Sequence, residues 1–413
     1  MADPRSFLLD LFHRAVEVAQ PAACVPANLP EPPTGRTYVV GAGKASAAMA
    51  RAVERNWSGA ISGLVVTRYG FEADCDQIEI ACASHPVPDR AGLAAAGRIV
   101  EIAGQAGPDD LLLVLISGGG SALLTLPADG LTLEDKQAVN GALLNSGAPI
   151  EAMNCIRKHL SKIKGGRLAA ASGGAPVHTM VISDVVGDDL STIASGPTVP
   201  DPTTYADARA YVERYHIELP AASIRILEDE ADETPKPGGP VFDRARTTII
   251  AAPSASIEAA AASARAAGYN VISLGDRIEG EAREVGREHA RMALKAAAGT
   301  IILSGGELTV TLDKRGRGGP NAEYALALAE ALGGERPVFA LAADTDGIDG
   351  SEDNAGAIVE PDTLVRAGRM GMNPARYLRD HNSYDFFAEL DDLVMTGPTQ
   401  TNVNDFRAIL VAG

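Results

Sequence analysis

A lysine at the start of a helical pattern is the first residue in this chain that could do chemistry. The stretch YVVGAGKASAAM (Tyr38–Met49) runs from an apolar strand pattern through Gly41, Gly43 and Lys44 into an alanine-rich helical pattern. Backbone N–H groups at the start of a helix favour an anion, and Lys44 adds a mobile positive charge at the same place. The stretch therefore predicts a site for a phosphate or another anion, with an ordinary strand-to-helix turn as the alternative.

Two familiar phosphate-binding loops do not fit this stretch. A Walker A loop needs a glycine where this chain has Tyr38, and Ala45 replaces the hydroxyl residue that would hold magnesium. The dinucleotide fingerprint fits Gly41 and Gly43 but meets Ser46 where it requires a third glycine. The next strand pattern, GLVVTRYG, places no acid at its end for a ribose hydroxyl. The pattern therefore predicts an anion site without specifying a nucleotide.

Glycine-rich turns follow an apolar strand pattern in each half of the chain. Three consecutive glycines in ISGGGSALL let backbone amides approach a ligand closely, which predicts a nest for a phosphate or carboxylate, with a packing turn as the alternative. The signal in LSGGELTV is weaker, because a hairpin between neighbouring strands explains its glycines equally well. Together with Gly43 of the first stretch, the candidate binding residues in these turns are Ser117, Gly118, Gly119, Gly120, Ser121, Gly305, Gly306 and Glu307.

A basic segment stands out in a chain whose formal net charge is −18. The segment NCIRKHLSKIKGGRLA (154–169) places five cations within eleven positions. Arg157 and Lys164 lie seven residues apart, hence on one face if the helix is continuous. We interpret the segment as a basic wall for an anionic substrate, with a solvated helix face as the alternative. Its cations are Arg157, Lys158, Lys162, Lys164 and Arg167.

Aspartates gather after one strand pattern in each half. Asp184 and Asp189 follow HTMVIS, and Asp344 and Asp346 follow VFALAA. Carboxylates at strand ends suit Mg²⁺, which takes oxygen ligands and keeps some of its own waters. These four aspartates are therefore the candidate metal ligands, with a plain acidic surface loop as the alternative. The single His85 of SHPVPD is expected to be structural, as most isolated histidines are.

The composition bounds the class of protein. Its 413 residues suffice for two or three domains, and its acidic balance opposes binding to nucleic acid. No run reaches the roughly 20 apolar residues of a membrane span, and the N-terminus lacks the pattern of a signal peptide. Four cysteines without short paired spacings are typical of free thiols in a reducing compartment. We therefore expect a cytoplasmic protein that binds neither nucleic acid nor membrane.

Apolar strand patterns alternate with longer helical patterns, which predicts an α/β fold of two domains with largely parallel sheets covered by helices. The stretch LEDEADETPKPGGP (227–240) places the boundary near residue 240, giving a Rossmann-like domain 1–240 and a second α/β domain 241–413. Ligands bind beyond the carboxyl ends of strands in such sheets, so the turns and aspartates of both halves predict an active site in an interdomain cleft. The predicted strands lie near 36–41, 63–67, 77–82, 111–116, 178–183, 247–252, 270–274, 300–303, 307–312, 337–342 and 406–411.

Taken together, the motifs resemble those of the glycerate 2-kinase family, whose C-terminal part is called the MOFRL domain. The resemblance covers nearly the whole chain, in order, through VVGAGKASAAMA, SHPVPD, LISGGGSALL, NCIRKHLSKIKGGRLA, ISDVVGDDLSTIASGPTVPDPTTY, GRGGPNAEYALALA, AADTDGIDGSEDNAGAIV and GPTQTNVNDFRAILV. It implies transfer of the γ-phosphoryl group of ATP, with Mg²⁺, to the 2-hydroxyl of D-glycerate. Some relatives are labelled hydroxypyruvate reductases, so an NAD(P)H-dependent reductase is the alternative. A homodimer is compatible with the sequence.

The resemblance also implies roles for individual residues. Lys44 matches the family's catalytic lysine. Many relatives have a second implicated arginine where this chain has Pro320, so Arg317 in the same GRGGPNAE segment is taken as its substitute, and Asn321 as a binding residue. Asp184 is expected to orient the 2-hydroxyl, and the carboxylate of glycerate to lie against the arginine of the basic segment or the glycine nest.

Overall fold

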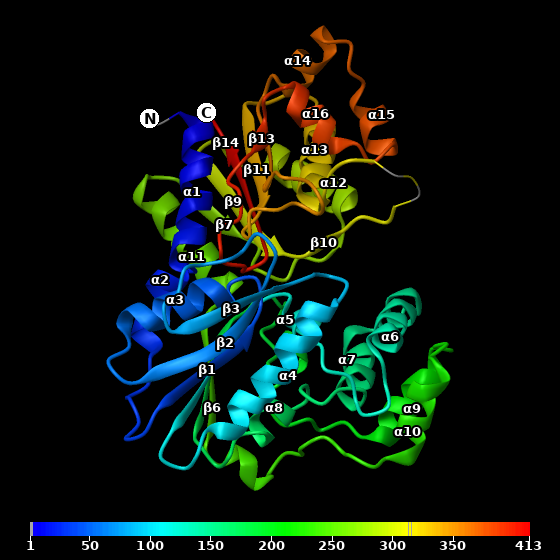
Figure 1. The fold of residues 1–413 in the computed structure, drawn as a ribbon. Coiled ribbons are helices and arrows are strands. Elements are labelled where there is room, and N and C mark those ends of the chain that lie inside the picture. The colour runs from blue at the N-terminus through cyan, green and yellow to red at the C-terminus, as the bar shows by residue number, and fades with distance from the viewer. Residues whose placement is uncertain (1–2, 313, 315) are drawn as a thin grey trace. The chain divides into compact units, whose positions relative to one another are not determined.

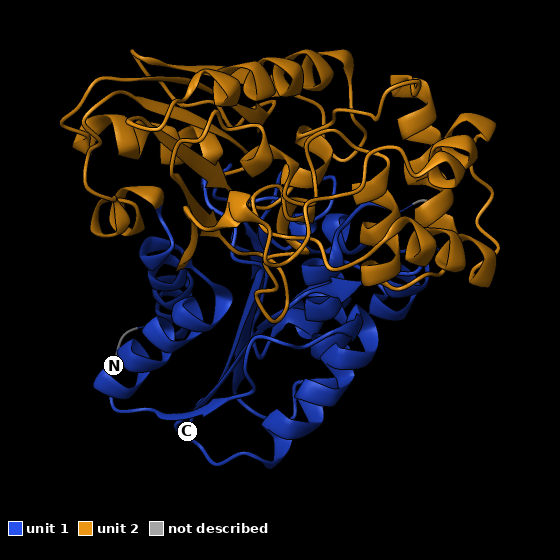
Figure 2. Ribbon diagram, turned by 90° about the horizontal axis from the view of Figure 1, so that it is seen from below, with its two compact units in different colours: residues 1–20, 251–413 blue, residues 21–250 orange. Residues whose placement is uncertain are grey.

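The computed structural model describes residues 3–312, 314 and 316–413. The chain forms two compact units, coloured separately in Figure 2. The first-sheet unit is residues 21–250, and the second-sheet unit joins residues 1–20 to residues 251–413.

The first-sheet unit is built on a six-stranded sheet in the order β3-β2-β1-β4-β5-β6. Strands β1 to β5 pair in parallel, which confirms the predicted largely parallel sheet for this unit. Strand β4 is buried along its whole length, as its unbroken apolar run LLLVLI requires. The strands are β1 (Thr37–Ala42), β2 (Ile61–Arg68), β3 (Ile78–Ala83), β4 (Leu111–Ile116), β5 (Val177–Ile182) and β6 (Ala245–Ala251).

The strand order reverses between β1 and β4. The chain runs outward from β1 through β2 to β3 and then returns to the other side of β1 as β4. In open α/β sheets such a reversal leaves a crevice beyond the carboxyl ends of the two strands, where ligands bind. Strand β1 ends at Ala42 and β4 at Ile116, so both glycine-rich turns of this unit begin at the reversal.

Helices of the first-sheet unit fall into two groups. One group covers the sheet, and the other forms a helical cluster with its own apolar core of Val139, Leu143, Ile156 and Leu160 (Figure 1). The sheet-side helices are α2 (Pro21–Cys24), α3 (Ser46–Asn56), α4 (Arg90–Gln105), α5 (Gly120–Leu123) and α8 (Arg167–Ala170). The cluster contains α6 (Leu133–Asn145), α7 (Ile150–His159), α9 (Tyr205–Arg214) and α10 (Ala221–Asp229). Short 3₁₀ turns are η1 (Pro26–Asn28), η2 (Ile193–Ser195) and η3 (Pro240–Phe242).

The second-sheet unit has a mixed sheet in the order β13-β12-β11-β14-β9-β7. The prediction of a largely parallel sheet is wrong here, because the last strand, β14, runs between β11 and β9 and is antiparallel to both. Strand β12 is also antiparallel to its neighbours, and only β7 and β9 pair in parallel in this sheet. The strands are β7 (Asn270–Ser273), β9 (Thr300–Gly306), β11 (Val338–Asp344), β12 (Gly356–Val359), β13 (Leu393–Val394) and β14 (Asp405–Val411).

The hairpin that was the alternative explanation of the second Ser-Gly-Gly turn does not form. Strand β9 continues through Gly305 and Gly306 and takes β14 and β7 as partners. The following strand, β10 (Leu308–Thr309), pairs instead with β8 (Gly280–Glu281) in a separate two-stranded sheet. The helices of this unit are α1 (Pro4–Val18), α11 (Pro253–Ala266), α12 (Ala282–Lys295), α13 (Pro320–Leu332), α14 (Thr363–Arg369), α15 (Pro374–Arg379) and α16 (Ser383–Glu389). None of the helices in the described part of the chain is both long and apolar enough to span a bilayer.

The predicted boundary near residue 240 differs from the observed division at both ends of the first-sheet unit. Helix α1 belongs to the second-sheet unit because Leu8, Leu11 and Phe12 are buried in the same apolar cluster as β14 and α11. The ring of Phe12 lies 6.2 Å from that of Phe406 on β14. Strand β6, placed by its sequence among the second set, adds instead to the edge of the first sheet.

We predict that Phe12→Ala destabilises the second-sheet unit selectively. Removing this buried ring leaves a cavity beside β14 and should lower the free energy of unfolding by about 3–5 kcal/mol. Amide hydrogen exchange should then speed up in β14 but not in β4. Glu17→Ala on the exposed face of the same helix is the control and should leave both strands protected. Equal loss of protection in both sheets would contradict the assignment of α1.

Candidate active site

The two glycine-rich turns at the β1/β4 reversal are hydrogen-bonded to each other. The N–H of Lys44 donates to Gly118 O (2.8 Å), and the N–H of Ala45 donates to Ser117 Oγ (2.9 Å). In return, the N–H of Ser117 donates to Ala42 O (3.2 Å). The structure therefore brings together two motifs that are 72 residues apart in sequence, and it places Lys44 at the position where α/β sheets bind ligands.

Two glycines make this close approach sterically possible. Gly43 has φ +140°, and a Cβ atom on it would lie 2.1 Å from Ser117 Oγ. Gly119 has φ +79°, and a Cβ atom on it would lie 3.1 Å from the His85 ring and 3.6 Å from Lys44 Cγ. The sequence predicted a structural role for His85, yet its ring lies at the candidate site. A side chain at either glycine would separate the groups that converge here.

Ser46 stands where a dinucleotide-binding loop would have its third glycine. Its side chain is fully buried, and its hydroxyl lies 2.8 Å from both Gly43 O and Val66 O. Ser46 thus connects the turn to β2 by hydrogen bonds. In a dinucleotide-binding loop a glycine at this position allows the helix to pack closely on the strand, and here the serine side chain occupies that space. This geometry supports the sequence-based argument against a dinucleotide loop.

The second side of the site is a chain of polar contacts that starts at Ser121. The Nζ of Lys164 donates to Ser121 O (2.5 Å) and Ser121 Oγ (3.2 Å). The hydroxyls of Ser121 and Ser195 are 2.9 Å apart, and Ser195 Oγ donates to Asn154 Oδ1 (3.2 Å). Arg157 donates to the same Asn154 oxygen at 3.3 Å. Ser195 has φ 60°, an uncommon backbone conformation for a residue with a side chain, of the kind that gathers at functional sites.

The five cations of the basic segment divide into two kinds. Three form ion pairs: Lys158 with Asp201 (3.3 Å), Lys162 with Asp129 (2.8 Å), and Arg167 with Asp232 (2.5 Å). Arg157 and Lys164 form no ion pair within the described residues. The condition under which these two would share one helical face, a continuous helix, is not met, because α7 ends at His159 and Lys164 lies in the turn that follows.

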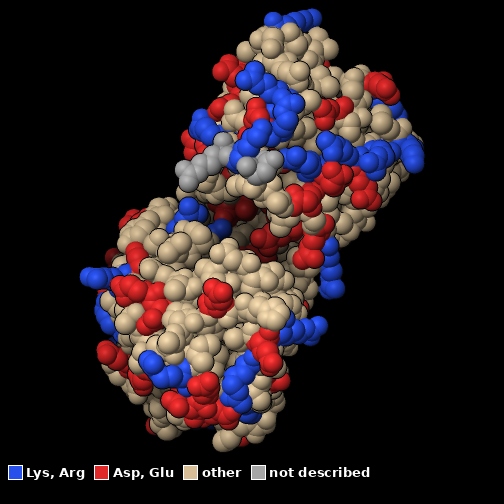
Figure 3. Space-filling view, turned by 90° about the vertical axis from the view of Figure 1, so that its right-hand side faces the viewer, with Lys and Arg blue, Asp and Glu red and all other residues tan. Residues whose placement is uncertain are grey.

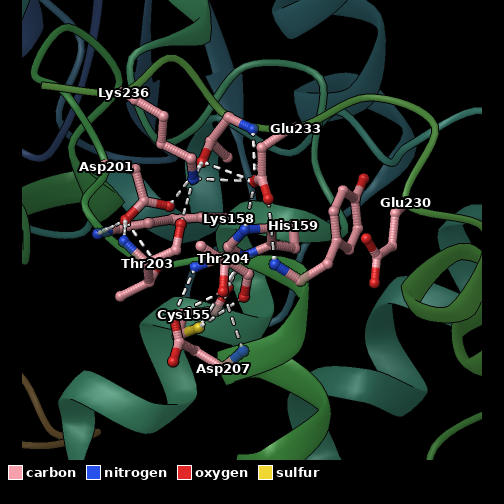
Figure 4. A network of polar contacts seen from close by, with 12 residues as sticks. Cys155, Lys158, His159, Asp201, Thr203, Thr204, Asp207, Glu230, Glu233 and Lys236 are labelled. Carbon is pink, nitrogen blue, oxygen red and sulfur yellow. Dashed lines mark hydrogen bonds and ion pairs between the residues drawn. The ribbon is translucent and has the colours of Figure 1, made fainter. Parts of the chain in front are cut away.

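A network of polar contacts anchors the end of α7, as Figure 4 shows. Lys158 points toward Asp201, and Glu233 contacts both His159 Nε2 (2.8 Å) and Lys236 Nζ (2.9 Å). Burial opposes the charge of Glu233, but hydrogen bonds from Lys236 and from the backbone N–H groups of Thr234 and Tyr205 outweigh it and lower its pKa to about 2. The network fixes the helix that carries Asn154 and Arg157. On the face drawn in Figure 3, cationic and anionic side chains are interspersed.

In the second-sheet unit, buried acids surround the start of α13. The backbone N–H groups of Asn321 and Ala322 donate to the two oxygens of Asp349 (2.9 and 2.8 Å). Asn321 Nδ2 also donates to Asp405 Oδ1 (2.7 Å), and Asp405 pairs with the buried Arg407. The sequence reading included Asn321 but missed Asp405, because only the antiparallel register of β11 and β14 places it opposite Asp344.

Asp344 and Asp346 lie beside this acidic group. The N–H of Asp346 donates to Asp344 Oδ1 (2.8 Å), and the N–H of Ile348 donates to Asp346 Oδ1 (2.8 Å). Among the residues with a described placement, no three His, Cys, Asp or Glu side chains are gathered to hold a metal. The donor chemistry still fits Mg²⁺, which is often held by one or two carboxylates together with phosphate oxygens and waters.

The remaining predicted residues are engaged in local contacts. Asp189 accepts hydrogen bonds from Ser191 N–H (3.0 Å), Ser191 Oγ (2.8 Å) and Thr192 Oγ1 (2.7 Å), so a metal would compete with these donors. Asp184 is half-buried just after β5. Its roles as metal ligand and as the group that orients the substrate hydroxyl stay predictions.

Arg317 and the second Ser-Gly-Gly turn have contacts of their own within the second-sheet unit. Arg317 is 53% exposed, pairs with Glu352 (2.7 Å) and Asp385 (2.8 Å), and would have to exchange these partners to reach a phosphoryl group. In the turn, the carbonyls of Gly305 and Gly306 accept from the guanidinium of Arg407 (3.2 and 3.1 Å), and Glu307 is exposed. This turn therefore has a structural function whatever it binds.

The chain is similar to known proteins along nearly its whole length. Residues 7–228 match the family described as "Domain of unknown function (DUF4147)", and residues 300–405 match the MOFRL family. The D-glycerate 2-kinase of Thermotoga maritima is 38% identical over 98% of each chain. A protein of Agrobacterium vitis that carries the provisional name hydroxypyruvate reductase is 54% identical, over 98% of this chain and 94% of the relative. A crystal structure of glycerate kinase from Thermotoga maritima superposes with a TM-score of 0.88, at 36% identity and 99% coverage of both chains.

We predict a pH dependence of stability from Asp349. Burial, together with the charge of Asp405, raises its pKa to about 7, although the hydrogen bonds that Asn321 and Ala322 donate act in the opposite direction. Between about pH 4 and pH 7 the carboxyl of Asp349 is therefore protonated in the folded state but ionised in the unfolded state. The free energy of unfolding falls as pH rises through this window, by at most about 1.4 kcal/mol per pH unit. In denaturant titrations Asp349→Asn should flatten this slope. Asp391→Asn, at an exposed position, should keep it, and an unchanged slope in Asp349→Asn would show that Asp349 is not the group responsible.

Proposed function

Because the chain belongs to the glycerate 2-kinase family, we propose that it transfers the γ-phosphoryl group of ATP to the 2-hydroxyl of D-glycerate, giving 2-phosphoglycerate and ADP. The observation that carries the proposal is the convergence of Lys44, Gly119 and His85 at the reversal of strand order. A relative named D-glycerate 2-kinase is similar over nearly the full length of both chains, which supports the same assignment.

Phosphoryl transfer needs charge neutralisation and positioning more than covalent chemistry. The ammonium group of Lys44 contacts the oxygens of the transferring phosphoryl group and offsets the charge that they carry in the transition state. The Ser117–Ser121 turn fixes that lysine by its hydrogen bonds to the backbone of residues 44 and 45. Arg317 is a second proposed cation, conditional on release from Glu352 and Asp385.

The nucleotide and metal belong to the proposal. Mg²⁺, when bound, neutralises charge on the β- and γ-phosphates of ATP. The residues proposed to hold it are carboxylates after β5 and β11: Asp184, Asp189, Asp344 and Asp346. Asp184 is also proposed to orient the acceptor hydroxyl. The four cysteines are free thiols, as predicted, which supports a cytoplasmic setting.

A second candidate function is an NAD(P)H-dependent hydroxypyruvate reductase. The specific observation in its favour is the 54% identical relative with that provisional name. Two features oppose it. The hydroxyl of the buried Ser46 is hydrogen-bonded to the carbonyls of Gly43 and Val66, and the GLVVTRYG segment, which contains the end of β2, has no acidic residue. The usual binding site for a nicotinamide dinucleotide has a glycine at the position of Ser46 and an acidic residue at the end of the strand that follows.

One assay distinguishes the two candidates. The purified protein is incubated with D-glycerate and MgATP, and separately with hydroxypyruvate and NADH or NADPH. ADP that appears only when glycerate is present supports the kinase. Oxidation of NADH or NADPH that depends on hydroxypyruvate, without ADP formation in the first arm, would replace the kinase by the reductase.

We predict that Lys44→Ala lowers the turnover number of glycerate phosphorylation by about 10²-fold or more, comparable to loss of one preorganised group that stabilises charge in a transition state. The fold should survive, because the hydrogen bond from residue 44 to the glycine-rich turn comes from its backbone N–H. Lys162→Ala removes an exposed lysine paired with Asp129 and serves as the control. A folded Lys44→Ala protein with near-normal turnover would exclude Lys44 from catalysis.

A further inference from the structure

Three cations in the first-sheet unit come from separate segments and are buried or half-buried. Lys136 lies on α6, Arg157 on α7, and Lys164 in the turn after α7. Lys136 and Lys164 are each 1% exposed, and Arg157 is half-buried. Their charges act on one another: Arg157 disfavours the charged form of Lys136, and both disfavour the charged form of Lys164. We call these three residues the buried cation cluster.

Within the described residues, no carboxylate compensates this cluster. The Nζ of Lys136 is buried without a hydrogen-bond partner. Lys164 donates to the carbonyl and hydroxyl of Ser121, and Arg157 to the amide oxygen of Asn154, all of which are neutral. The neighbouring Lys158 shows the usual solution, a buried pair with Asp201. Burying an ammonium group without a counter-ion is unfavourable and favours loss of its proton, whereas an anion from outside the chain would stabilise the charged form.

The cluster is connected to the candidate active site. Ser121, which accepts from Lys164, is half-buried and lies two residues after Gly119. Two residues span at most about 7 Å, and a Cβ atom on Gly119 would lie 3.6 Å from Lys44 Cγ. Ser121 therefore belongs to the same glycine-rich turn that contacts Lys44, and a group held at Ser121 borders the candidate active site.

We propose that the buried cation cluster, Lys136 with Arg157 and Lys164, binds the carboxylate of the acid substrate, which enters past the half-buried Ser121 and Arg157. This inference rests on the proposed function, because it takes the acid to be the phosphoryl acceptor at Lys44. It assigns roles to Lys136 and Lys164 and makes the negative charge of the acceptor a requirement for binding.

The cluster also makes binding dependent on pH. Burial, with the charge of Arg157, lowers the pKa of Lys136 to about 7, and burial with the charges of Lys136 and Arg157 lowers that of Lys164 well below its ordinary value. The other groups that face the cluster, Ser121, Ser195 and Asn154, are neutral. A carboxylate favours the protonated lysines, so binding takes up protons and weakens as pH rises above 7.

The test measures ligand binding by calorimetry and by the shift in melting temperature, neither of which needs turnover. D-glycerate should bind the wild-type protein and raise its melting temperature, whereas glycerol, which lacks the carboxylate, should not. In Lys136→Met, Lys164→Met and Arg157→Gln, the dissociation constant for D-glycerate should rise at least about 10-fold, in line with loss of one hydrogen-bonded charge contact. Lys162→Met, in the same segment but paired with Asp129, should bind like wild type.

Two further readouts separate a binding role from a structural one. Calorimetry in buffers of different ionisation enthalpy should show proton uptake on binding at pH 8 in wild type, and less uptake in Lys136→Met. Lys136→Met without ligand should melt at a higher temperature than wild type, since it removes an uncompensated buried cation. Normal D-glycerate affinity in both Lys136→Met and Arg157→Gln would overturn the proposal.

Three other outcomes distinguish a failure of the proposed binding site from a failure of the proposed kinase activity. Inorganic phosphate that binds through Lys136 while D-glycerate does not would overturn the assignment to the substrate carboxylate. Cluster-dependent binding of D-glycerate without ADP formation in the presence of MgATP would uphold the site and refute the kinase. ADP formation with an unchanged KM for D-glycerate in all three variants would uphold the kinase and refute the site.

Discussion

The hydrogen bonds between the turns after β1 and β4 are the constraint on which the rest of the site depends. Parallel pairing of the two strands brings the turns side by side, and the backbone of Lys44 and Ala45 then bonds to Gly118 and Ser117. The contact requires Gly43, because a Cβ atom there would occupy the position of the Ser117 hydroxyl. The catalytic lysine of the proposal is thus positioned by main-chain hydrogen bonds.

A second organising principle is the pairing of charges. In a chain of net charge −18, most cations of the basic segment are neutralised by nearby acids, and their function is structural. The buried cation cluster departs from this rule, and its Lys164 donates to Ser121 of the glycine-rich turn. In the second-sheet unit Asp405 pairs with the buried Arg407, whereas the buried Asp349 has no ion pair among the described residues. Such imbalances are costly to fold and are therefore informative about ligands.

Much of the first-sheet unit could be predicted from the sequence. Strand β4 was located to the residue, because six apolar residues flanked by turn formers allow one interpretation. The lysine, the glycine nest and the arginine of the basic segment could be proposed as site residues because each belongs to a local pattern, and their roles stay predictions. The contact between the lysine turn and the glycine nest was not predictable in the same way, because it depends on the order of strands in the sheet.

Other features depend on contacts that no local pattern records. Helix α1 joins the second-sheet unit through the burial of Phe12 against Phe406, at nearly the other end of the chain. In the sequence alone Lys136 resembles any other charged residue, and only the burial of its Nζ without a hydrogen-bond partner marks it as a candidate for ligand binding. The position of Asp405 beside the other acids could be predicted only by knowing that β14 runs antiparallel to β11.

The most direct test of the central claim is ³¹P NMR of the reaction of D-glycerate with MgATP. The account predicts a phosphomonoester on carbon 2, with signals of ADP; phosphate on carbon 3, or an unchanged spectrum of ATP, would contradict it.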